Sequence, residues 1–346
     1  MDFHRHDHQK SDGRSLYLYS RERREYTVTN DVEGPYAPNP HLRWHPLRRE
    51  WVAYNPGRNT RTLNPPKDFN PLAPVAVDGF PGEIPVTDFE IAVFEHRWPG
   101  FAMHAVGLGD DDCPAAHGAC EVVVYSTRDE GSLHDLSVDH IALLLQAWAD
   151  RYRALSALPE VQYVLPFESR GAHVGVTLPH PHGQIYAFPF LPPIIERQAR
   201  AQMENQALTR LVHAPNPRFV LEDRDQTVVL CPEYARYPYE CWIMPKEPVS
   251  APDEMSDAAL LDFAEALKRT QKRLDTFFGG QTPLVMWCAL PPKGFEASWP
   301  FHVQLWPMQR GSNAFKFLAS VEQITGVYLV DVLPEEAAQS LRDVTL

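Results

Sequence analysis

The sequence lacks any apolar run long enough to span a lipid bilayer, and its first ten residues lack the apolar core of a secretory signal peptide. Cysteine is scarce: the five cysteines, at positions 113, 120, 231, 241 and 288, are scattered and odd in number, which argues against a disulfide framework. Basic residues are the scarcer charge, with 32 Lys and Arg against 45 Asp and Glu and a formal net charge of −13. Nucleic-acid backbones and anionic membranes repel such a chain, so we expect a soluble, cytoplasmic protein that binds neither.

The chain has enough apolar residues to fold around a large core. Its 346 residues are 44% apolar and 22% charged, which excludes a disordered chain and predicts one large domain or two fused units. The 33 prolines indicate many irregular connections. Residues 1–40 are predicted to form a poorly ordered tail, in which His4, His6 and His8 are solvated, with adventitious metal binding as the alternative.

An approximate repeat of one α+β unit runs through the chain. In each copy, two predicted strands flank an amphipathic helix whose first residue follows a serine N-cap, Ser137 in the first copy and Ser256 in the second. The predicted strands lie at 121–125, 161–167, 240–244 and 284–290. Each copy ends with a histidine-containing segment, at His182 and at His302.

The intervals between corresponding features agree closely. Sixteen residues lead from Glu121 to its N-cap, and sixteen lead from Glu240 to its N-cap. From the N-caps, 45 residues lead to His182 and 46 lead to His302. A chance succession of common elements is the alternative interpretation. We predict instead that two similar units form one composite body.

The segment Pro179-His-Pro-His-Gly-Gln184 carries the densest chemistry in the chain. In an extended segment, His180, His182 and Gln184 project from one face. The two prolines stiffen the backbone, and Gly183 lets a ligand approach it closely. A lone histidine pair is usually a structural feature of a core or loop, but this combination favours a functional site. The second copy retains only His302 and Gln304, so one half is expected to have kept the chemistry.

These side chains suit a transfer between phosphates. A neutral imidazole is a good nucleophile near neutral pH, and attack by His182 on phosphorus gives a covalent phosphoramidate-type intermediate. The amide of Gln184 cannot act as an acid, but it can hydrogen-bond a phosphoryl oxygen. Without a general acid, the leaving group must depart stably as an anion, as a sugar phosphate does. The motif therefore favours nucleotidyl exchange over hydrolysis.

At these residues the chain resembles the galactose-1-phosphate uridylyltransferase family, the branch of the histidine-triad superfamily in which Gln replaces the last triad histidine. The resemblance continues upstream in Phe167-Glu-Ser-Arg-Gly and covers roughly residues 40–340. It implies an α+β fold of tandem duplicated histidine-triad-like units, with antiparallel sheets and packed helices. We place the two units at 41–200, with the motif, and at 201–346, which is degenerate.

The resemblance also assigns roles to individual residues. It makes His182 the nucleophile that takes the uridylyl group, and Gln184 a ligand of the transferred phosphate. The other implied substrate-binding residues are Arg58 and Arg61 for the sugar phosphate, Phe167, Ser169, Gly175 and Thr177 on the nucleotide side, and Phe94 beside the base. A solvated basic loop is the alternative for the two arginines, and a buried core position is the alternative for Phe94.

A third group is implied to reach the hexose, partly across a homodimer interface. Its members are Lys316, Phe317 and Glu322. The chain departs from the family pattern at Ser169, at Thr177 and at Val321, where the family commonly has Asn, Ser and Tyr. These departures leave the base and the sugar open.

The metal sites of the family are largely missing. Relatives with structural zinc have an early Cys-x-x-Cys and a middle His, where this chain has Asn70-Pro-Leu-Ala73 and Asp129. Asp129 and His180, the first histidine of the motif, are then the only credible donors. They include no thiolate and are too few for zinc. A second metal site would consist of Gln198, Cys288, His302 and Gln304, which is also a poor set of ligands. We therefore predict no metal cofactor.

A separate Cys-x3-His-x2-Cys cluster is an incomplete zinc site. It consists of Cys113, His117 and Cys120 and lacks a fourth donor. We leave open whether it binds a metal.

Three functions remain in view. The first is a homodimeric uridylyltransferase that exchanges UMP between UDP-glucose and a hexose 1-phosphate such as galactose 1-phosphate, by a ping-pong route through uridylyl-His182. The second is a related nucleotidyltransferase or phosphorylase for another sugar nucleotide, such as ADP-glucose. The third is a sugar-nucleotide-binding protein without turnover, which the intact motif and Arg58 and Arg61 disfavour.

Overall fold

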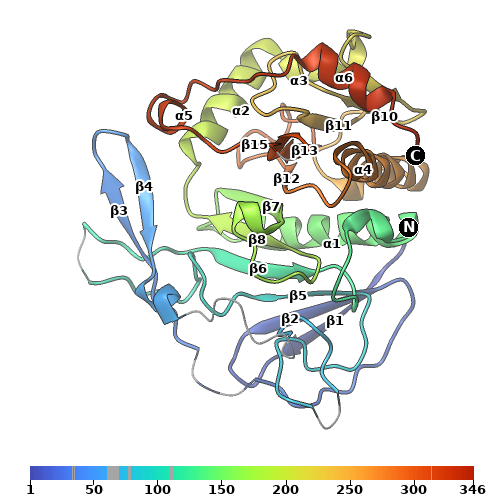
Figure 1. Cartoon of the computed structure of the whole chain (residues 1–346). Coiled ribbons are helices and arrows are strands. Elements are labelled where there is room, and N and C mark those ends of the chain that lie inside the picture. The colour runs from blue at the N-terminus through green and yellow to red at the C-terminus, as the bar shows by residue number, and fades with distance from the viewer. Residues whose placement is uncertain (33, 35, 61–69, 77–78, 110–111, 313) are drawn as a thin grey trace.

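The central element of the protein is an eleven-stranded antiparallel sheet (Figure 1). The computed structural model describes residues 1–346 apart from 33, 35, 61–69, 77–78, 110–111 and 313. In their order across the sheet, the strands are β1 (His4–Gln9), β2 (Ser15–Ser20), β5 (Ile91–Glu95), β6 (Ala119–Val124), β8 (His182–Phe188), β7 (Tyr163–Arg170), β12 (Leu284–Ala289), β13 (His302–Pro307), β11 (Cys241–Pro245), β10 (Thr227–Leu230) and β9 (Val220–Asp223).

Two long helices cover one face of this sheet. They are α1 (Val138–Ser156) and α4 (Asp257–Phe278), and their apolar stripes share one core with the inward-facing residues of the central strands. Each helix begins as the sequence predicts: the hydroxyl of Ser137 accepts a hydrogen bond from the backbone N–H of His140, and that of Ser256 from Ala259.

Shorter elements lie at the other face and at the rim. Helices α2 (Pro193–Asn205) and α3 (Ala207–His213) pack through Ala199 and Leu208 onto tryptophans of the second unit. The hairpin of β3 (His41–His45) and β4 (Glu50–Tyr54) projects beside the first unit (Figure 1). The remaining strands and α-helices of the described chain are β14 (Gln309–Gly311), β15 (Ala314–Phe315), α5 (Ser320–Thr325) and α6 (Pro334–Arg342). Short 3-10 helices lie at Pro56–Thr60, Leu133–Asp135, Ala172–Val174 and Pro252–Glu254.

The predicted duplication is present in the register of the strands. Phe167 of β7 lies opposite Gln184 of β8, and 120 residues later Trp287 of β12 lies opposite Gln304 of β13. The two units join edge to edge where β7 pairs with β12, and there Phe167 lies opposite Trp287. The α+β fold of two tandem units with antiparallel strands and packed helices is therefore confirmed.

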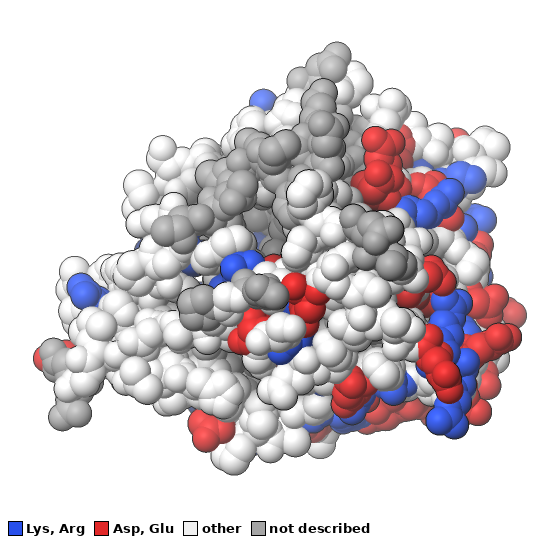
Figure 2. Space-filling view, turned by 90° about the horizontal axis from the view of Figure 1, so that it is seen from below, with Lys and Arg blue, Asp and Glu red and all other residues white. Residues whose placement is uncertain are grey.

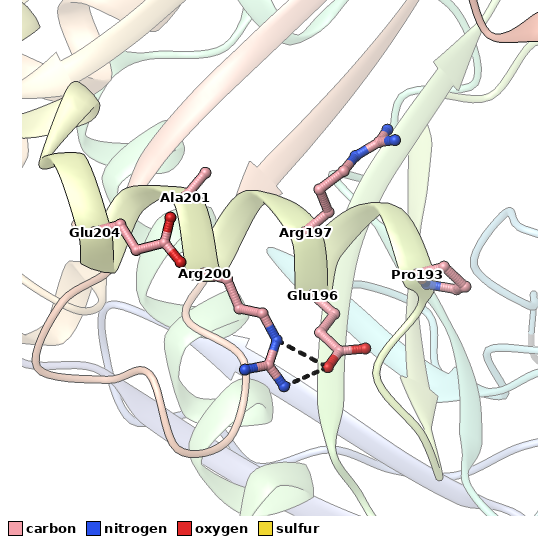
Figure 3. Close-up of a pocket in the computed structure, with 6 residues that line it drawn as sticks. All are labelled: Pro193, Glu196, Arg197, Arg200, Ala201 and Glu204. Atoms are coloured by element: carbon pink, nitrogen blue, oxygen red, sulfur yellow. Dashed lines mark hydrogen bonds and ion pairs between the residues drawn. The ribbon is translucent and has the colours of Figure 1, made fainter.

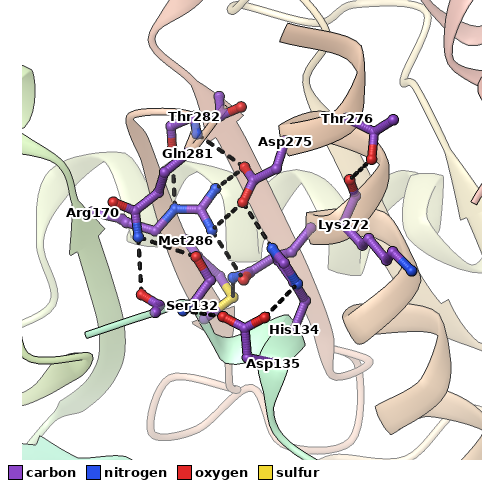
Figure 4. Close-up of polar contacts among 12 residues, drawn as sticks. Ser132, His134, Asp135, Arg170, Lys272, Asp275, Thr276, Gln281, Thr282 and Met286 are labelled. Atoms are coloured by element: carbon purple, nitrogen blue, oxygen red, sulfur yellow. Dashed lines mark hydrogen bonds and ion pairs between the residues drawn. The ribbon is translucent and has the colours of Figure 1, made fainter. Parts of the chain in front are cut away.

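A polar cluster joins the two units at this seam (Figure 4). A guanidinium Nη2 of Arg170, on β7, lies 2.6 Å from a carboxylate oxygen of Asp275, on α4, and His134 Nε2 lies 2.9 Å from the other oxygen. Burial opposes the ionised form, but the hydrogen bond from His134 and the charge of Arg170 lower the pKa of Asp275. The amide of Gln281 also donates to the carbonyl of Gly131 across the seam.

The prediction of a poorly ordered tail over residues 1–40 is wrong for residues 4–20, which hold two paired strands. His4, His6 and His8 lie in β1, which pairs with β2, and β2 continues the main sheet through β5. Alternating apolar residues in β2 supply the reason: Leu16 and Leu18 are buried in a core cluster with Phe94. The predicted boundary between residues 200 and 201 falls inside α2, the helix that follows β8.

On the face shown in Figure 2, Lys and Arg lie next to Asp and Glu, and most of these charges gather on the right of the view. Within the residues that the structure describes, no helix combines the length and the apolar character that crossing a membrane requires.

Candidate active site

The motif begins the strand β8 at the middle of the first unit. His182 and Gln184 alternate with Gly183 and Ile185, so the first two share the face that points away from α1 and α4. Both side chains are half-buried, whereas Gly183 and Ile185 are buried, and Ile185 belongs to the core beneath the helices. The predicted pairing of an imidazole and an amide on one face is thus found in the structure.

His182 is held in one tautomer by the backbone. Its Nδ1 lies 2.7 Å from the carbonyl oxygen of His180, and because a carbonyl can only accept, Nδ1 carries the proton. Burial lowers the pKa of His182, although the hydrogen bond to His180 opposes this shift. The ring is therefore neutral near pH 7, with the lone pair on Nε2 available for nucleophilic attack.

His180 does not lie beside His182 on the strand, contrary to the prediction of three side chains on one face. It occupies the bend before β8 and is 1% exposed. Its Nε2 lies 2.8 Å from the carbonyl oxygen of Ser126, and its Nδ1 lies 2.9 Å from the amide nitrogen of Asn70. The proline on either side of His180 ends the regular alternation that the prediction assumed.

Gly183 is required by the packing around β8. A Cβ atom built at this position would meet the hydroxyl of Tyr125 at 2.5 Å and the carbonyl oxygen of Phe167 at 2.8 Å. The Tyr125 hydroxyl in turn donates to the buried carboxylate of Glu168, at 3.2 Å. The glycine thus lets the motif strand lie directly against a buried Tyr–Glu pair.

The neighbouring strand contributes the predicted nucleotide side. Phe167 of β7 pairs with Gln184, and Ser169 lies two residues further along the same face. The ring of Phe167 packs edge-on against Tyr186, at 5.2 Å between ring centroids. The structure therefore brings Phe167 and Ser169 together with His182 and Gln184.

Arg58 reaches the same face from a 3-10 turn, Pro56–Thr60. One guanidinium nitrogen donates to the carbonyl of Trp98 at 3.1 Å. Burial raises the pKa of Tyr186, and Arg58 opposes this through its charge and a hydrogen bond, so the guanidinium lies beside that ring. Tyr186 and Gln184 lie two residues apart and therefore share one face of β8, so Arg58 is close to the motif. Arg61 lies outside the described residues.

The remaining predicted residues lie at different distances from the motif strand. Gly175 and Thr177 are exposed in the loop between β7 and β8, and Gly175 has a φ of 81°, which favours glycine. Phe94 is 2% exposed in a core cluster, which is the alternative that the sequence left open.

Lys316 and Glu322 form an ion pair that is buried near the C-terminus. The ammonium group also donates to the carbonyl of Leu329 at 2.9 Å. The hydrogen bond from Lys316, together with two backbone N–H groups, lowers the pKa of Glu322 to about 2. Phe317, between them in sequence, is 63% exposed. Within one chain, only the phenylalanine of this group is free to meet another molecule.

The donors of the two family metal sites do not fit a metal here. Both ring nitrogens of His180 already have protein partners, so neither offers a free lone pair for zinc. At the second site, Cys288 pairs with Val303 and therefore lies on the opposite face of the sheet from His302.

Two residues of the separate Cys113, His117 and Cys120 cluster are also poorly suited to bind a metal. Cys120 is 2% exposed on β6, and burial raises its pKa to about 12. Nδ1 of His117 lies 3.3 Å from the carbonyl of Met103. Among the described residues, no group of three or more His, Cys, Asp or Glu side chains is arranged to hold a metal ion. The absence of a metal cofactor stays a prediction.

The second unit contains an equivalent histidine, His302, whose Nδ1 also contacts a backbone carbonyl but whose Nε2 is not free. Nδ1 of His302 lies 3.0 Å from the carbonyl oxygen of Pro300. Nδ1 of His182 makes the equivalent contact, at 2.7 Å, with the carbonyl oxygen of His180. However, Nε2 of His302 lies 3.0 Å from the amide nitrogen of Gln304, and burial lowers the pKa of this histidine to about 4. Because this residue is 1% exposed, the second unit has no accessible nucleophile at this position.

A surface hollow of about 420 Å³ lies along α2 (Figure 3). Its lining contains an ion pair between Glu196 and Arg200, one helical turn apart. It contains neither a histidine nor an aromatic ring that could hold a base, so we do not assign it to the chemistry.

Sequence reasoning missed two supporting residues. Asn70 was considered only as a missing zinc ligand, although its amide contacts His180. Tyr186 carries no role in the sequence prediction, although it lies beside both Phe167 and Arg58. The two-residue spacing of His182, Gln184 and Tyr186 is the signal in the sequence that places Tyr186 on the same strand face.

Comparisons with known proteins identify the family of this chain. Residues 112–192 match the family model described as the N-terminal domain of galactose-1-phosphate uridyl transferase. Galactose-1-phosphate uridylyltransferase of Thermotoga maritima is 34% identical over 316 residues, covering 87% of this chain and 98% of that protein. ADP-glucose phosphorylase of Arabidopsis thaliana is 24% identical over 347 residues, covering 91% and 96%. A solved structure of a uridylyltransferase has a TM-score of 0.76 and 25% identity, covering 87% of this chain and 97% of that one. The chain therefore belongs to the galactose-1-phosphate uridylyltransferase family.

Proposed function

We propose that this protein is a nucleotidyltransferase that exchanges UMP between UDP-glucose and a hexose 1-phosphate, galactose 1-phosphate above all, through a covalent uridylyl-His182. One observation carries the covalent step. Nδ1 of His182 donates to a backbone carbonyl, which leaves Nε2 unprotonated on the face that also presents Gln184. The family to which the chain belongs supports the choice of substrates.

The first half-reaction balances without a proton donor. Nε2 of His182 attacks the α-phosphorus of UDP-glucose, and the bond from that phosphorus to the bridging oxygen breaks. Glucose 1-phosphate leaves with the electron pair, as a stable anion. The imidazole ring, now bonded to phosphorus, retains its Nδ1 proton, and the carbonyl of His180 stabilises its positive charge.

The second half-reaction reverses these changes. A phosphate oxygen of the incoming hexose 1-phosphate attacks the same phosphorus, and the phosphorus–nitrogen bond breaks. His182 becomes neutral again without losing its Nδ1 proton. We expect the amide of Gln184 to hydrogen-bond a phosphoryl oxygen in both steps, and the positive charge of Arg58 to attract the phosphate groups.

A second candidate is a related enzyme that takes ADP-glucose. The similarity to ADP-glucose phosphorylase over 91% of the chain supports it, as do the departures at Ser169 and Thr177 on the nucleotide side. A binding protein without turnover is disfavoured, because the nucleophile and its tautomer are intact.

A panel of sugar nucleotides distinguishes these functions. With UDP-glucose alone, we expect a burst of about one glucose 1-phosphate per site and an acid-labile UMP on the protein, since no acceptor is present to complete the exchange. With ADP-glucose, the nucleotide should become attached to the protein far more slowly. Faster labelling by ADP-glucose would identify the second candidate, and labelling by no sugar nucleotide would contradict both enzymes.

We also propose that the active form is a homodimer. Phe317 is exposed, and the segment 317–333 carries further exposed apolar side chains, including Ile324, which is 76% exposed on α5. Apolar residues gathered on one exposed segment are typical of an interaction surface. A partner that covers this segment would correspond to the shared-site arrangement that the family resemblance implies, with Phe317 as the residue of that group that is free to reach the neighbouring site.

Sedimentation at assay concentration tests this assembly. The protein should sediment as a dimer, and Ile324→Glu should shift it toward monomer while lowering activity, because a charge would be buried in the interface. A fully active monomer would contradict the shared site.

The five cysteines are free, which supports a reducing, cytoplasmic location.

A further inference from the structure

We propose that Asn70 is a positioning residue for His182. Its amide fixes the ring of His180, and hence the backbone carbonyl that holds Nδ1 of His182, at the place where metal-binding members of the family have a zinc ligand. This inference rests on the proposed function, because His182 is the nucleophile of that reaction.

The direction of the hydrogen bond is defined by the surroundings of Asn70. The backbone N–H of Leu72 donates to the side-chain oxygen of Asn70 at 3.0 Å, so the amide nitrogen is the atom that faces His180. That nitrogen can only donate, and it lies 2.9 Å from Nδ1 of His180. Nδ1 is therefore an acceptor, and Nε2 carries the proton that is donated to the carbonyl of Ser126.

The turn that presents Asn70 is itself fixed to the core. Its backbone carbonyl accepts from Ala73, and the N–H of Glu83 donates to the carbonyl of Pro71. Leu72 is 4% exposed and packs in the cluster that includes Val122 of β6. A donor held in this way restricts the ring of His180 more than a side chain on a free loop would.

A chain of contacts then leads from the core to the nucleophile. The ring of His180 is held at both nitrogens, and its carbonyl oxygen lies 2.7 Å from Nδ1 of His182. On the next residue, the carbonyl of Pro181 accepts from the N–H of Tyr125 at 3.2 Å. Asn70 and Ser126 together do by hydrogen bonds what a zinc ion would do by coordination.

The variant Asn70→Asp removes the donor and keeps the acceptor for Leu72. It places a carboxylate oxygen opposite Nδ1 of His180, so we expect the ring to take up a proton there, and the resulting ion pair to move the ring and its carbonyl from the positions that the neutral pair holds. With saturating UDP-glucose, we expect the single-turnover rate of His182 labelling to fall about 10- to 100-fold, with the dissociation constant for UDP-glucose unchanged.

Asn39→Asp is the matched control. Asn39 also donates from its amide to a carbonyl, that of Gly107 at 2.8 Å, and accepts backbone N–H groups through its oxygen, but it contacts the loop around Val106 instead of the motif. It should lower the melting temperature to a similar degree without slowing labelling. An unchanged rate in Asn70→Asp, or an equal loss of rate in both variants, would overturn the proposal.

Two further measurements keep this inference separate from the proposed function. Imidazole ¹⁵N spectra should show a proton on Nδ1 of His182 and on Nε2 of His180 in the wild type, and a changed His180 pattern in Asn70→Asp. That result would support positioning by Asn70 even if no sugar nucleotide labelled the wild type, an outcome that would reject the proposed function alone. One equivalent of zinc in the purified protein would overturn the inference.

Discussion

His182→Ala should abolish the labelling of the protein by UDP-glucose and the release of glucose 1-phosphate that accompanies it. We expect the rate of the complete exchange to fall by at least about 10⁴-fold, because no other side chain on that face of β8 can supply a nucleophilic nitrogen. Rapid quenching with radiolabelled UDP-glucose measures the adduct, and mass spectrometry of the digested protein locates it.

His302→Ala is the matched control, since His302 holds the same place in the second unit with its Nε2 already blocked by Gln304. It should lower stability and leave one adduct per chain. His180→Asn is a second control: it should slow labelling without preventing it, because His180 acts on the nucleophile only through its carbonyl. Labelling that survives in His182→Ala and disappears in His180→Asn would reverse the assignment of the nucleophile.

Gln184→Ala should slow both half-reactions about 10²-fold while the adduct still forms on His182. The amide is expected to donate to a phosphoryl oxygen as negative charge develops there, in the way that a single oxyanion-hole donor does. The loss should therefore fall on the single-turnover rate at saturating UDP-glucose. Stopped time courses of each half-reaction measure it.

Gln304→Ala provides the comparison from the second unit. Gln304 contacts His302 and accepts from Trp306, so its removal leaves buried polar atoms unpaired at a cost of about 1–3 kcal/mol. We expect a lower melting temperature and an unchanged labelling rate. If Gln184→Ala also lost only stability, Gln184 would be a structural residue and the phosphate would need another donor.

Much of the fold was available from the order of residues. The serine N-caps at Ser137 and Ser256, and the equal spacing of the two units, required only local patterns of hydrogen-bonding and apolar side chains. The N-terminal hairpin was missed because its strands are stabilised by pairing with β5, about 70 residues further along the chain. Short polar strands such as β1 give little local signal for that pairing.

The candidate site divides in the same way. The sequence by itself predicts the nucleophile, its neighbouring amide and the shortage of metal ligands, because those predictions depend only on which side chains occupy given positions of the chain. Only the tertiary structure decided the tautomer of His182, the role of Asn70 and the requirement for Gly183, since each depends on an atom brought in by a distant segment. The same reason applies to the two histidines of the duplicated units. In both His182 and His302, Nδ1 contacts the backbone carbonyl two residues earlier. The tryptophans and the glutamine packed around His302 cover its Nε2, and this is the difference that we expect to make His302 unreactive.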